Sequence, residues 1–317
     1  MKNTREPLSL LSVVVPVMNE EENVTPLYER LSSALESANW HWECVIVDDG
    51  STDGTWEALR HLRLKNARLK LVRLKRNFGQ TAAMRCGIDK ASGDVIVTMD
   101  GDLQNDPSDI PRLVAKLSEG FDVVCGWRNQ RQDKLWSRKV PSMIANRLIG
   151  WLTGVLLHDY GCSLKAYRAA SIKRTPLYAE LHRFIPAMAT LTGAAITEIQ
   201  VNHHARQYGS TKYTIARTWR VAFDMITVAL LVKCAARPLR FFGGIALIAG
   251  AATIITLIQI GHVFTGPFTA APLILSSIAI LTAWLASHAL MIGLIAELFL
   301  ATVHGKLERL IVVEGER

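Results

Sequence analysis

Short apolar runs alternate with longer amphipathic runs along the first 130 residues of the chain. The apolar runs are nearly continuous, as in strands that are covered on both faces; they are Leu11–Val17, Glu43–Asp48, Leu69–Leu74, Val95–Met99 and Asp122–Cys125. The segments between them predict helices, namely Glu20–Ala38, Asp53–Leu64, Gln80–Ala91 and Pro107–Leu117. Such alternation indicates β-α-β crossovers and therefore an α/β domain whose mostly parallel sheet carries helices on both faces.

The C-terminal part of the chain has a different pattern. Between Phe241 and Leu300 the only formally charged residue is Glu297. Two apolar segments, about Phe241–Gly261 and Leu273–Ile295, reach the roughly 20 residues that a helix needs to cross a bilayer. A buried helical hairpin in a soluble core is the alternative, and it accounts poorly for the length of the segments and for the basic residues beside them. We therefore expect two transmembrane helices.

Basic residues lie on both sides of this hydrophobic region, at Lys233, Arg237, Arg240, Lys306 and Arg309. The positive-inside rule then places both ends in the cytoplasm. The expected organisation is a cytoplasmic domain over residues 1–236, a two-helix anchor over 237–300 and a cytoplasmic tail over 301–317. We expect an integral protein of the inner, or cytoplasmic, membrane.

Two further stretches, at about 137–157 and 214–236, mix basic residues with aromatic and aliphatic ones. Helices of this composition can lie in the headgroup plane of a membrane, although ordinary core helices have a similar pattern. The net charge is +8, with basic residues concentrated ahead of the apolar segments. That placement favours an anionic membrane surface over nucleic acid as the partner. The five scattered cysteines show no metal-type spacing and indicate reduced thiols.

Acidic and amide side chains follow three of the predicted strands, within Pro16–Glu20, Asp48–Thr55 and Asp100–Gln104. In open α/β sheets, ligands bind outside the carboxyl ends of the strands. A turn followed by a helix cap explains Asp49–Gly54 equally well. The pair Asp100 and Asp102 is more informative, because two carboxylates at a strand end can share one hard cation such as Mg²⁺ or Mn²⁺.

Four motifs together resemble a known family. They are Val-Pro-Val-Met-Asn-Glu-Glu-Glu-Asn, Val-Asp-Asp-Gly-Ser-Thr-Asp-Gly-Thr, Arg-Asn-Phe-Gly-Gln and Met-Asp-Gly-Asp-Leu-Gln. Their order is similar to that in the inverting glycosyltransferases of family 2, which have the Rossmann-like GT-A fold. Within the family the chain resembles the polyprenyl-phosphate branch, and most of all the GtrB-type undecaprenyl-phosphate glucosyltransferases. At Ser163–Lys165 it departs from the Gly-Phe-Arg of the dolichol enzymes, which argues against mannose.

The resemblance implies a role for each matching residue. A UDP-sugar would be held at its uridine end by Pro16, Glu20 and Asp49, and at its diphosphate by Asp100, Asp102 and the nearby Gln104. The phosphate groups of donor and acceptor would meet the matching basic and hydroxyl positions, namely Arg128, Arg138, Ser142, Arg206 and Lys212. Asp159 matches a third acidic position near the reacting centre. Of these, Asp102, Asp159 and Arg138 are the expected catalytic residues, and Asp100 and Asp102 the expected metal ligands.

The expected function is therefore the metal-dependent, inverting transfer of a hexose, with glucose from UDP-glucose as the first choice, to polyprenyl phosphate. Mannose or an aminosugar such as a 4-amino-arabinose derivative is the alternative. Two further hypotheses are a processive polysaccharide synthase and a non-catalytic membrane adaptor. The resemblance also implies a homo-oligomer such as a tetramer. Because a phosphomonoester is largely ionised at neutral pH, a strong general base is optional, and Asp159 is expected to be an orienting or metal-side group rather than an obligatory proton acceptor.

Overall fold

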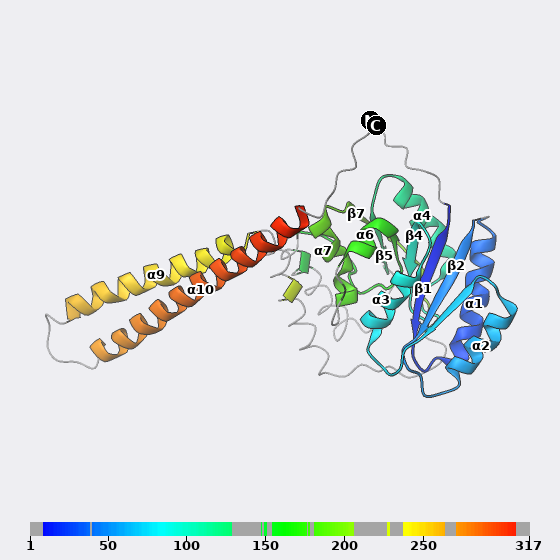
Figure 1. The fold of residues 1–317 in the computed structure, drawn as a ribbon, viewed down its shortest axis with the longest axis horizontal. Helices are drawn as coiled ribbons and strands as arrows, with labels where there is room; N and C mark the ends of the chain where they lie inside the picture. The colour runs from blue at the N-terminus through cyan, green and yellow to red at the C-terminus, as the bar shows by residue number, and fades with distance from the viewer. Residues whose placement is uncertain are drawn as a thin grey trace. The chain divides into compact units, whose positions relative to one another are not determined.

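The computed structural model describes residues 9–38, 40–128, 147, 149–150, 154–175, 177, 181–205, 227–228, 237–263 and 271–308. Most of both amphipathic stretches lies outside these residues. The chain divides into two compact units, Met1–Ala229 and Leu230–Arg317. The first unit carries the sheet, and the second carries the two apolar helices (Figure 1).

The first unit is built on a seven-stranded sheet with the order β3-β2-β1-β4-β6-β5-β7. The strands are β1 (Leu11–Val17), β2 (Trp42–Asp48), β3 (Leu69–Arg73), β4 (Val95–Thr98), β5 (Val123–Trp127), β6 (Lys165–Arg168) and β7 (Ile196–Gln200). Strands β3, β2, β1 and β4 pair in parallel, and so do β5 and β7. Only β6 runs against its neighbours β4 and β5. The prediction of a mostly parallel α/β sheet is confirmed.

Helices cover both faces of the sheet (Figure 1). Because side chains alternate along a strand, Val13 and Val15 of β1 face the core that α1 and α4 cover, whereas Val14 faces α3. The helices of this unit are α1 (Glu21–Glu36), α2 (Thr55–Lys65), α3 (Gln80–Lys90), α4 (Ile110–Ser118), α6 (Ala169–Arg174) and α7 (Ile185–Ala189). Short 3₁₀ turns η1 (Pro107–Asp109), η3 (Leu181–Phe184) and η4 (Thr190–Thr192) join them.

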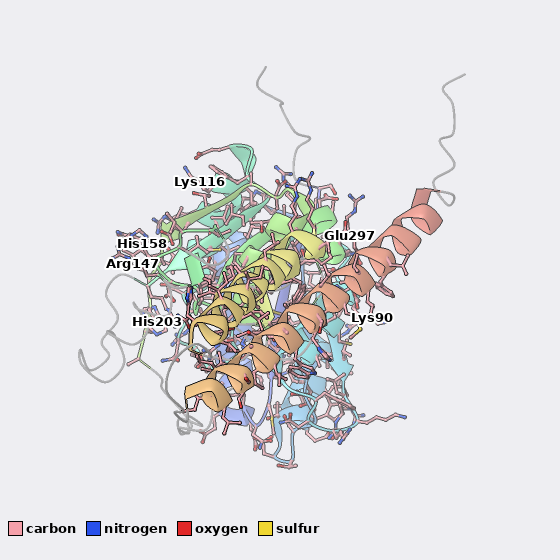
Figure 2. All side chains as sticks on the ribbon, turned by 90° about the vertical axis from the view of Figure 1, so that its left-hand side faces the viewer. Lys90, Lys116, Arg147, His158, His203 and Glu297 are labelled. Atoms are coloured by element: carbon pink, nitrogen blue, oxygen red, sulfur yellow. The ribbon has the colours of Figure 1, made fainter. Side chains whose placement is uncertain are left out.

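The second unit consists of two long helices, α9 (Pro238–Val263) and α10 (Ala271–Glu308), which lie side by side (Figures 1 and 2). Spans of 25 and 27 residues within them are long and apolar enough to cross a membrane, with mean hydropathy 2.2 and 2.0. Most of their apolar side chains are exposed, which is unlike a buried core hairpin. Both transmembrane segments predicted from the sequence are therefore found as helices.

Two polar contacts join these helices. Thr253 Oγ1 of α9 donates to Thr282 Oγ1 of α10 over 2.8 Å. The carboxylate of Glu297 accepts a hydrogen bond from the backbone N–H of Leu239 over 3.2 Å. The first N–H groups of a helix have no partner within the helix, and a negative charge is favourable there. Glu297, the lone charge of the hydrophobic region, therefore caps the start of α9.

The approach of α3 to the sheet leads to a first prediction. A Cβ atom on Gly87 would lie 2.4 Å from Val14 Cγ1 and 3.1 Å from Val47 Cγ2. Although alanine is the better helix former, we expect Gly87→Ala to lower the free energy of unfolding by about 1–3 kcal/mol through overpacking. Denaturant unfolding of the purified protein measures this. Adding Val14→Ala removes the clashing methyl groups, so the double variant should lose less stability than the two single losses added together. Simple additivity would contradict the close approach.

Candidate functional site

The loops that follow β1 and β2 are tied together at the carboxyl edge of the sheet. The Asn19 backbone N–H donates to Ser51 Oγ over 2.9 Å, and Asn19 Oδ1 accepts from the Thr52 N–H over 2.9 Å. The Glu20 N–H donates to Thr55 Oγ1 over 2.8 Å. Glu20, one of the predicted donor-binding residues, is therefore held at this edge by backbone contacts.

The N-terminus of α3 connects two of the predicted acidic residues. The buried carboxylate of Asp49 accepts hydrogen bonds from the backbone N–H groups of Phe78 and Gly79, over 2.8 and 2.9 Å. The next residue, Gln80, donates from Nε2 to Asp100 Oδ1 over 2.7 Å. Adjacent residues of one helix start thus touch Asp49 and Asp100, which brings the ends of β2 and β4 into one site.

The loop after β4 carries the predicted diphosphate-binding residues close to the end of β1. A Cβ atom on Gly101 would lie 3.5 Å from the carbonyl oxygen of Pro16. Asp102 is buried, and its Oδ1 accepts from the Gln104 N–H over 3.2 Å. Leu103 between them has φ +62°, which is uncommon for leucine. Its side chain is fully packed in the core, and this burial offsets the backbone strain that turns the loop.

Asp100 and Asp102 interact unfavourably with one another. Burial raises the pKa of Asp100, and the negative charge of Asp102 raises it further, against the opposing effects of Ser163, Arg128 and Lys165. No group of three or more histidine, cysteine, aspartate or glutamate side chains that could hold a metal ion occurs among the described residues. Two carboxylates that are one residue apart in a single loop nevertheless fit a hard divalent cation whose other ligands come from a substrate phosphate. The residues present therefore fit Mg²⁺ or Mn²⁺.

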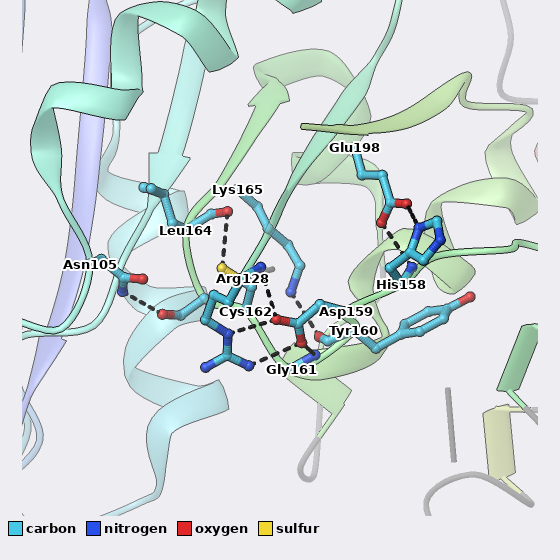
Figure 3. Close-up of polar contacts among 11 residues, drawn as sticks. Asn105, Arg128, His158, Asp159, Tyr160, Gly161, Cys162, Leu164, Lys165 and Glu198 are labelled. Carbon is cyan, nitrogen blue, oxygen red and sulfur yellow. Dashed lines mark hydrogen bonds and ion pairs between the residues drawn. The ribbon is translucent and has the colours of Figure 1, made fainter. Parts of the chain in front are cut away.

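Arg128 and Asp159 form a two-point ion pair (Figure 3). Arg128 Nε donates to Asp159 Oδ2 over 2.6 Å, and Nη2 donates to Oδ1 over 3.0 Å. Burial acts to lower the pKa of Arg128, but the hydrogen bonds and charge of Asp159 raise it overall. Asp159 Oδ1 also accepts from the Gly161 N–H over 3.0 Å. Both carboxylate oxygens of Asp159 are therefore engaged in hydrogen bonds.

A second contact joins the residues just before this pair. Trp127 and His158 stack with ring centroids 4.2 Å apart and an interplanar angle of 19°. Glu198 of β7 accepts from the His158 backbone N–H over 2.9 Å and also contacts His158 Nδ1 (Figure 3). Trp127, the last residue of β5, therefore meets His158, just as Arg128 after it meets Asp159, so the stacked rings lie directly beside the ion pair in the sequence.

The structure also brings in residues that the sequence analysis did not single out. Asn105 Nδ2 donates to Ser163 Oγ over 2.8 Å, and Lys165 is buried beside the acidic pair. Gln80 ends the motif Arg-Asn-Phe-Gly-Gln, and Ser163–Lys165 is the stretch that departs from the dolichol enzymes, so the resemblance to the family could have pointed to these residues. His158 and Glu198 carry no such signal in the sequence.

The remaining predicted residues are Arg138, Ser142, Arg206 and Lys212, and they lie outside the described residues. Of the predicted set, the structure therefore gathers Asp100, Asp102 and Gln104 in one loop and joins Arg128 to Asp159. The two groups are also electrostatically linked, because the charge of Arg128 acts on Asp100.

Comparison with known proteins gives consistent matches. The profile described as "Glycosyl transferase family 2" matches residues 12–176. The chain is 49% identical over 267 residues to a dodecaprenyl-phosphate galacturonate synthase of Rhizobium johnstonii, covering 82% of this chain and 79% of the relative. It is 38% identical over 292 residues to an undecaprenyl-phosphate 4-deoxy-4-formamido-L-arabinose transferase of Salmonella choleraesuis, covering 92% of this chain and 88% of the relative.

Among solved structures, the chain is similar to glucosyl-3-phosphoglycerate synthase of Mycobacterium tuberculosis, crystallised with Mn²⁺, UDP and phosphoglyceric acid. The TM-score is 0.53 at 20% identity, and the match covers 70% of this chain and 78% of that one. This likeness concerns the fold, and it confirms the expected GT-A architecture.

The buried ion pair leads to a second prediction. Arg128 and Asp159 side chains are 12% and 8% exposed. Asp159→Asn leaves the guanidinium without its counter-charge, so we expect a loss of roughly 3–5 kcal/mol in unfolding free energy, measured by denaturant unfolding. Replacing both residues, Arg128→Met with Asp159→Leu, should cost clearly less than Asp159→Asn alone. If the double variant were the less stable protein, the pair would not be the source of the effect.

Proposed function

The chain belongs to glycosyl transferase family 2, and from this premise we propose that it transfers one sugar from a nucleotide diphosphate donor to a polyprenyl phosphate lipid, with inversion at the sugar C1. The observation that carries the proposal is the pair of neighbouring carboxylates, Asp100 and Asp102, at the carboxyl edge of the sheet, where Gln80 Nε2 donates to Asp100 and the Gln104 N–H donates to Asp102. The names of the two relatives, both of which describe sugar transfer involving a polyprenyl phosphate, support the acceptor.

The donor diphosphate is assigned to the loop after β4. Asp100 and Asp102 would hold Mg²⁺ or Mn²⁺, and Gln80 fixes the orientation of Asp100. A divalent cation there would neutralise the negative charge that collects on the departing diphosphate. Pro16, Glu20 and Asp49, at the ends of β1 and β2, remain the proposed residues for the uridine end. Their placement at the same edge as Asp100 agrees with a nucleotide that lies across the strand ends.

The reaction needs no proton transfer from the acceptor. An oxygen of the lipid phosphate forms a bond to C1, the bond from C1 to the donor diphosphate breaks, and its electron pair leaves with the nucleotide diphosphate. A phosphomonoester with a second pKa of about 6 is already mostly dianionic at neutral pH. The commitment of Asp159 to Arg128 is compatible with this step. Arg138, Ser142, Arg206 and Lys212 are the proposed partners of the phosphate groups.

For the sugar, we propose galacturonic acid or a 4-formamido-arabinose in preference to glucose. The sequence motifs alone favour glucose, but neither of the two relatives is named for it. The relative that is 49% identical is a galacturonate synthase, and the one that is 38% identical transfers a modified arabinose, which is the aminosugar alternative. Identity over 82% and 92% of the chain is a better guide to the sugar than four short motifs.

The acceptor also explains the second unit. We propose that α9 and α10 anchor the protein in the inner membrane, with both chain ends and the catalytic unit in the cytoplasm. Two such helices among the described residues suit single transfer better than a processive synthase, which has to move a growing polymer through the bilayer. A homo-oligomer such as a tetramer remains part of the proposal.

A donor screen tests the proposed function. Purified full-length protein is incubated with Mg²⁺ or Mn²⁺, undecaprenyl phosphate and labelled UDP-galacturonate, UDP-4-formamido-arabinose or UDP-glucose. We expect a lipid-extractable product from one of the first two donors, at a rate at least tenfold above that with UDP-glucose. A product from glucose alone would overturn the sugar assignment, and no product from any UDP- or GDP-sugar would overturn the proposed function.

Loss of the metal site provides a further prediction. We expect Asp102→Asn to lower kcat by roughly a hundredfold or more, because a main source of charge stabilisation on the leaving group is removed. Excess chelator should abolish turnover by the unchanged protein, and added Mn²⁺ should restore it. Asp89→Asn, an exposed carboxylate of α3 paired with Arg85, serves as the control and should retain activity. Turnover that is insensitive to both chelator and Asp102→Asn would contradict the metal assignment.

A further inference from the structure

The loop with the two proposed metal ligands, residues 99–104, is held at both ends by one residue of another loop, Ser163. Thr98, the last residue of β4, precedes the loop, and its Oγ1 donates to the carbonyl oxygen of Ser163 over 2.9 Å. Asn105 follows the loop, and its Nδ2 donates to Ser163 Oγ over 2.8 Å (Figure 3). A single serine thus contacts the residue before the acidic loop and the residue after it.

Ser163 is itself firmly held. Its neighbours Cys162 and Leu164 are fully buried, and the carbonyl oxygen of Leu164 accepts a hydrogen bond from the Gly126 N–H of β5 over 2.9 Å. Strand β6 begins two residues after Ser163 and pairs with both β4 and β5. The backbone at Ser163 therefore cannot shift without disturbing the sheet, and its hydroxyl is a fixed attachment point for Asn105.

The backbone around Asn105 has separate support. Asn105 forms an antiparallel bridge with His203, and the carbonyl oxygen of Gln104 accepts from the His204 N–H over 2.8 Å. These contacts involve main-chain groups, so they would remain if the Ser163 hydroxyl were lost. We therefore expect a protein without this hydroxyl to fold. It would lose the contact that fixes the buried side chain of Asn105.

The acidic loop needs such a contact because part of it is strained. Leu103 has φ +62°, and a backbone conformation of this kind persists only where surrounding contacts impose it. Leu103 follows one proposed metal ligand directly, and Asn105 lies two residues further along. The hydrogen bond from Asn105 to Ser163 is thus one of the contacts that hold the strained turn and, with it, the carboxylate of Asp102.

The Ser163 hydroxyl also acts on the other proposed ligand. Because its oxygen accepts from Asn105, its proton remains available to donate. Burial raises the pKa of Asp100, and a hydrogen bond from the Ser163 side chain opposes that effect. This agrees with the contacts at the two ends of the loop, which place Ser163 beside it.

We propose that Ser163 is a positioning residue of the metal site: its hydroxyl holds Asn105, its carbonyl oxygen holds Thr98, and the loop between them is thereby fixed for a divalent cation. This inference rests on the proposed function, in which the cation joins this loop to the donor diphosphate. Ser163 acts through the loop and is not assigned a contact with the cation or the substrate. Removing partners that orient metal ligands typically weakens metal binding by about ten- to a hundredfold.

Removal of the hydroxyl tests the proposal. For Ser163→Ala in full-length detergent-solubilised protein at saturating UDP, we expect Mn²⁺ to bind about tenfold more weakly, because the loop that would ligate it is no longer fixed through Asn105. Electron paramagnetic resonance measures free Mn²⁺. Ser163→Thr keeps a hydroxyl at the same position and should restore most of the affinity.

A double-mutant cycle tests whether the effect passes through Asn105. Asn105→Ala removes the same hydrogen bond from the other side, so it should also weaken Mn²⁺ binding. When both residues are alanine, Mn²⁺ should bind no more weakly than in the more affected single variant, because the bond can be lost only once. Losses that multiply fully in the double variant would show that the two side chains act independently, and would contradict the proposed route.

Ser12→Ala is the matched control for stability. Ser12 Oγ likewise accepts a hydrogen bond over 2.8 Å, from the Gly93 N–H, and it donates to Glu43 over 2.7 Å. Ser12 lies near the start of β1, at the opposite end of this strand from the proposed site. Because its hydroxyl is fully buried and meets a carboxylate, we expect Ser12→Ala to lower the melting temperature at least as much as Ser163→Ala. It should leave Mn²⁺ binding unchanged.

The outcomes distinguish this inference from the proposed function. Weaker Mn²⁺ binding in Ser163→Ala, restored in Ser163→Thr and absent from Ser12→Ala, supports the positioning role. Unchanged Mn²⁺ binding in Ser163→Ala would overturn it, and so would equal weakening in Ser12→Ala, since that would follow from lost stability alone. If the unchanged protein bound Mn²⁺ and UDP but transferred no sugar, the proposed function would fail, while the variants would still decide the role of Ser163.

Discussion

The repulsion between two carboxylates at the end of β4 is the constraint on which the rest of the site depends. Asp100 and Asp102 are only one residue apart, and burial together with the negative charge of Asp102 raises the pKa of Asp100. The surrounding contacts limit this cost without removing it: Gln80 donates to Asp100, and the Gln104 backbone donates to Asp102. A divalent cation at the proposed metal site would relieve the repulsion between these two carboxylates, which the fold leaves in place.

The reversed strand β6 explains how the other charged groups reach the same place. Because β6 is antiparallel to β4, its first residue, Lys165, lies beside the last residue of β4. The loop that enters β6, with Asp159 in it, therefore arrives at the edge from which the Asp100 loop departs. Strand β5 is antiparallel to β6 as well, so its far end delivers Arg128 to this edge. The antiparallel direction of β6 therefore places five charged residues at one edge of the sheet: Asp100, Asp102, Asp159, Arg128 and Lys165.

The sequence predicted those strands whose hydrophobic pattern matches their burial in the folded protein. The run Leu11–Val17 is apolar on both faces because both faces are covered, and it becomes β1 with the predicted bounds. Strand β6 is four residues long and contains a buried lysine, so neither its length nor its polarity indicates a strand. Asp100 and Asp102 were predicted because they are neighbours in the chain. The contact of His158 with Glu198 joins residues 40 positions apart and depends on where β7 lies in the sheet, which a single sequence does not reveal.

The two units of the chain divide the physical demands of the proposed reaction between them. The donor is soluble and strongly anionic, and it needs a rigid, charged site whose groups are fixed before it arrives. The backbone contacts of Asp49 and the two-point contact of Asp159 provide such fixation.

The acceptor is confined to a bilayer, so its encounter with the enzyme depends on where the enzyme resides. In the proposed reaction, helices with apolar side chains on their exposed faces would hold the catalytic unit at the membrane and so raise the effective concentration of the lipid phosphate. Under the proposed function, affinity for the lipid would therefore come largely from the anchor, and the charged residues of the sheet edge would serve the donor and the transition state.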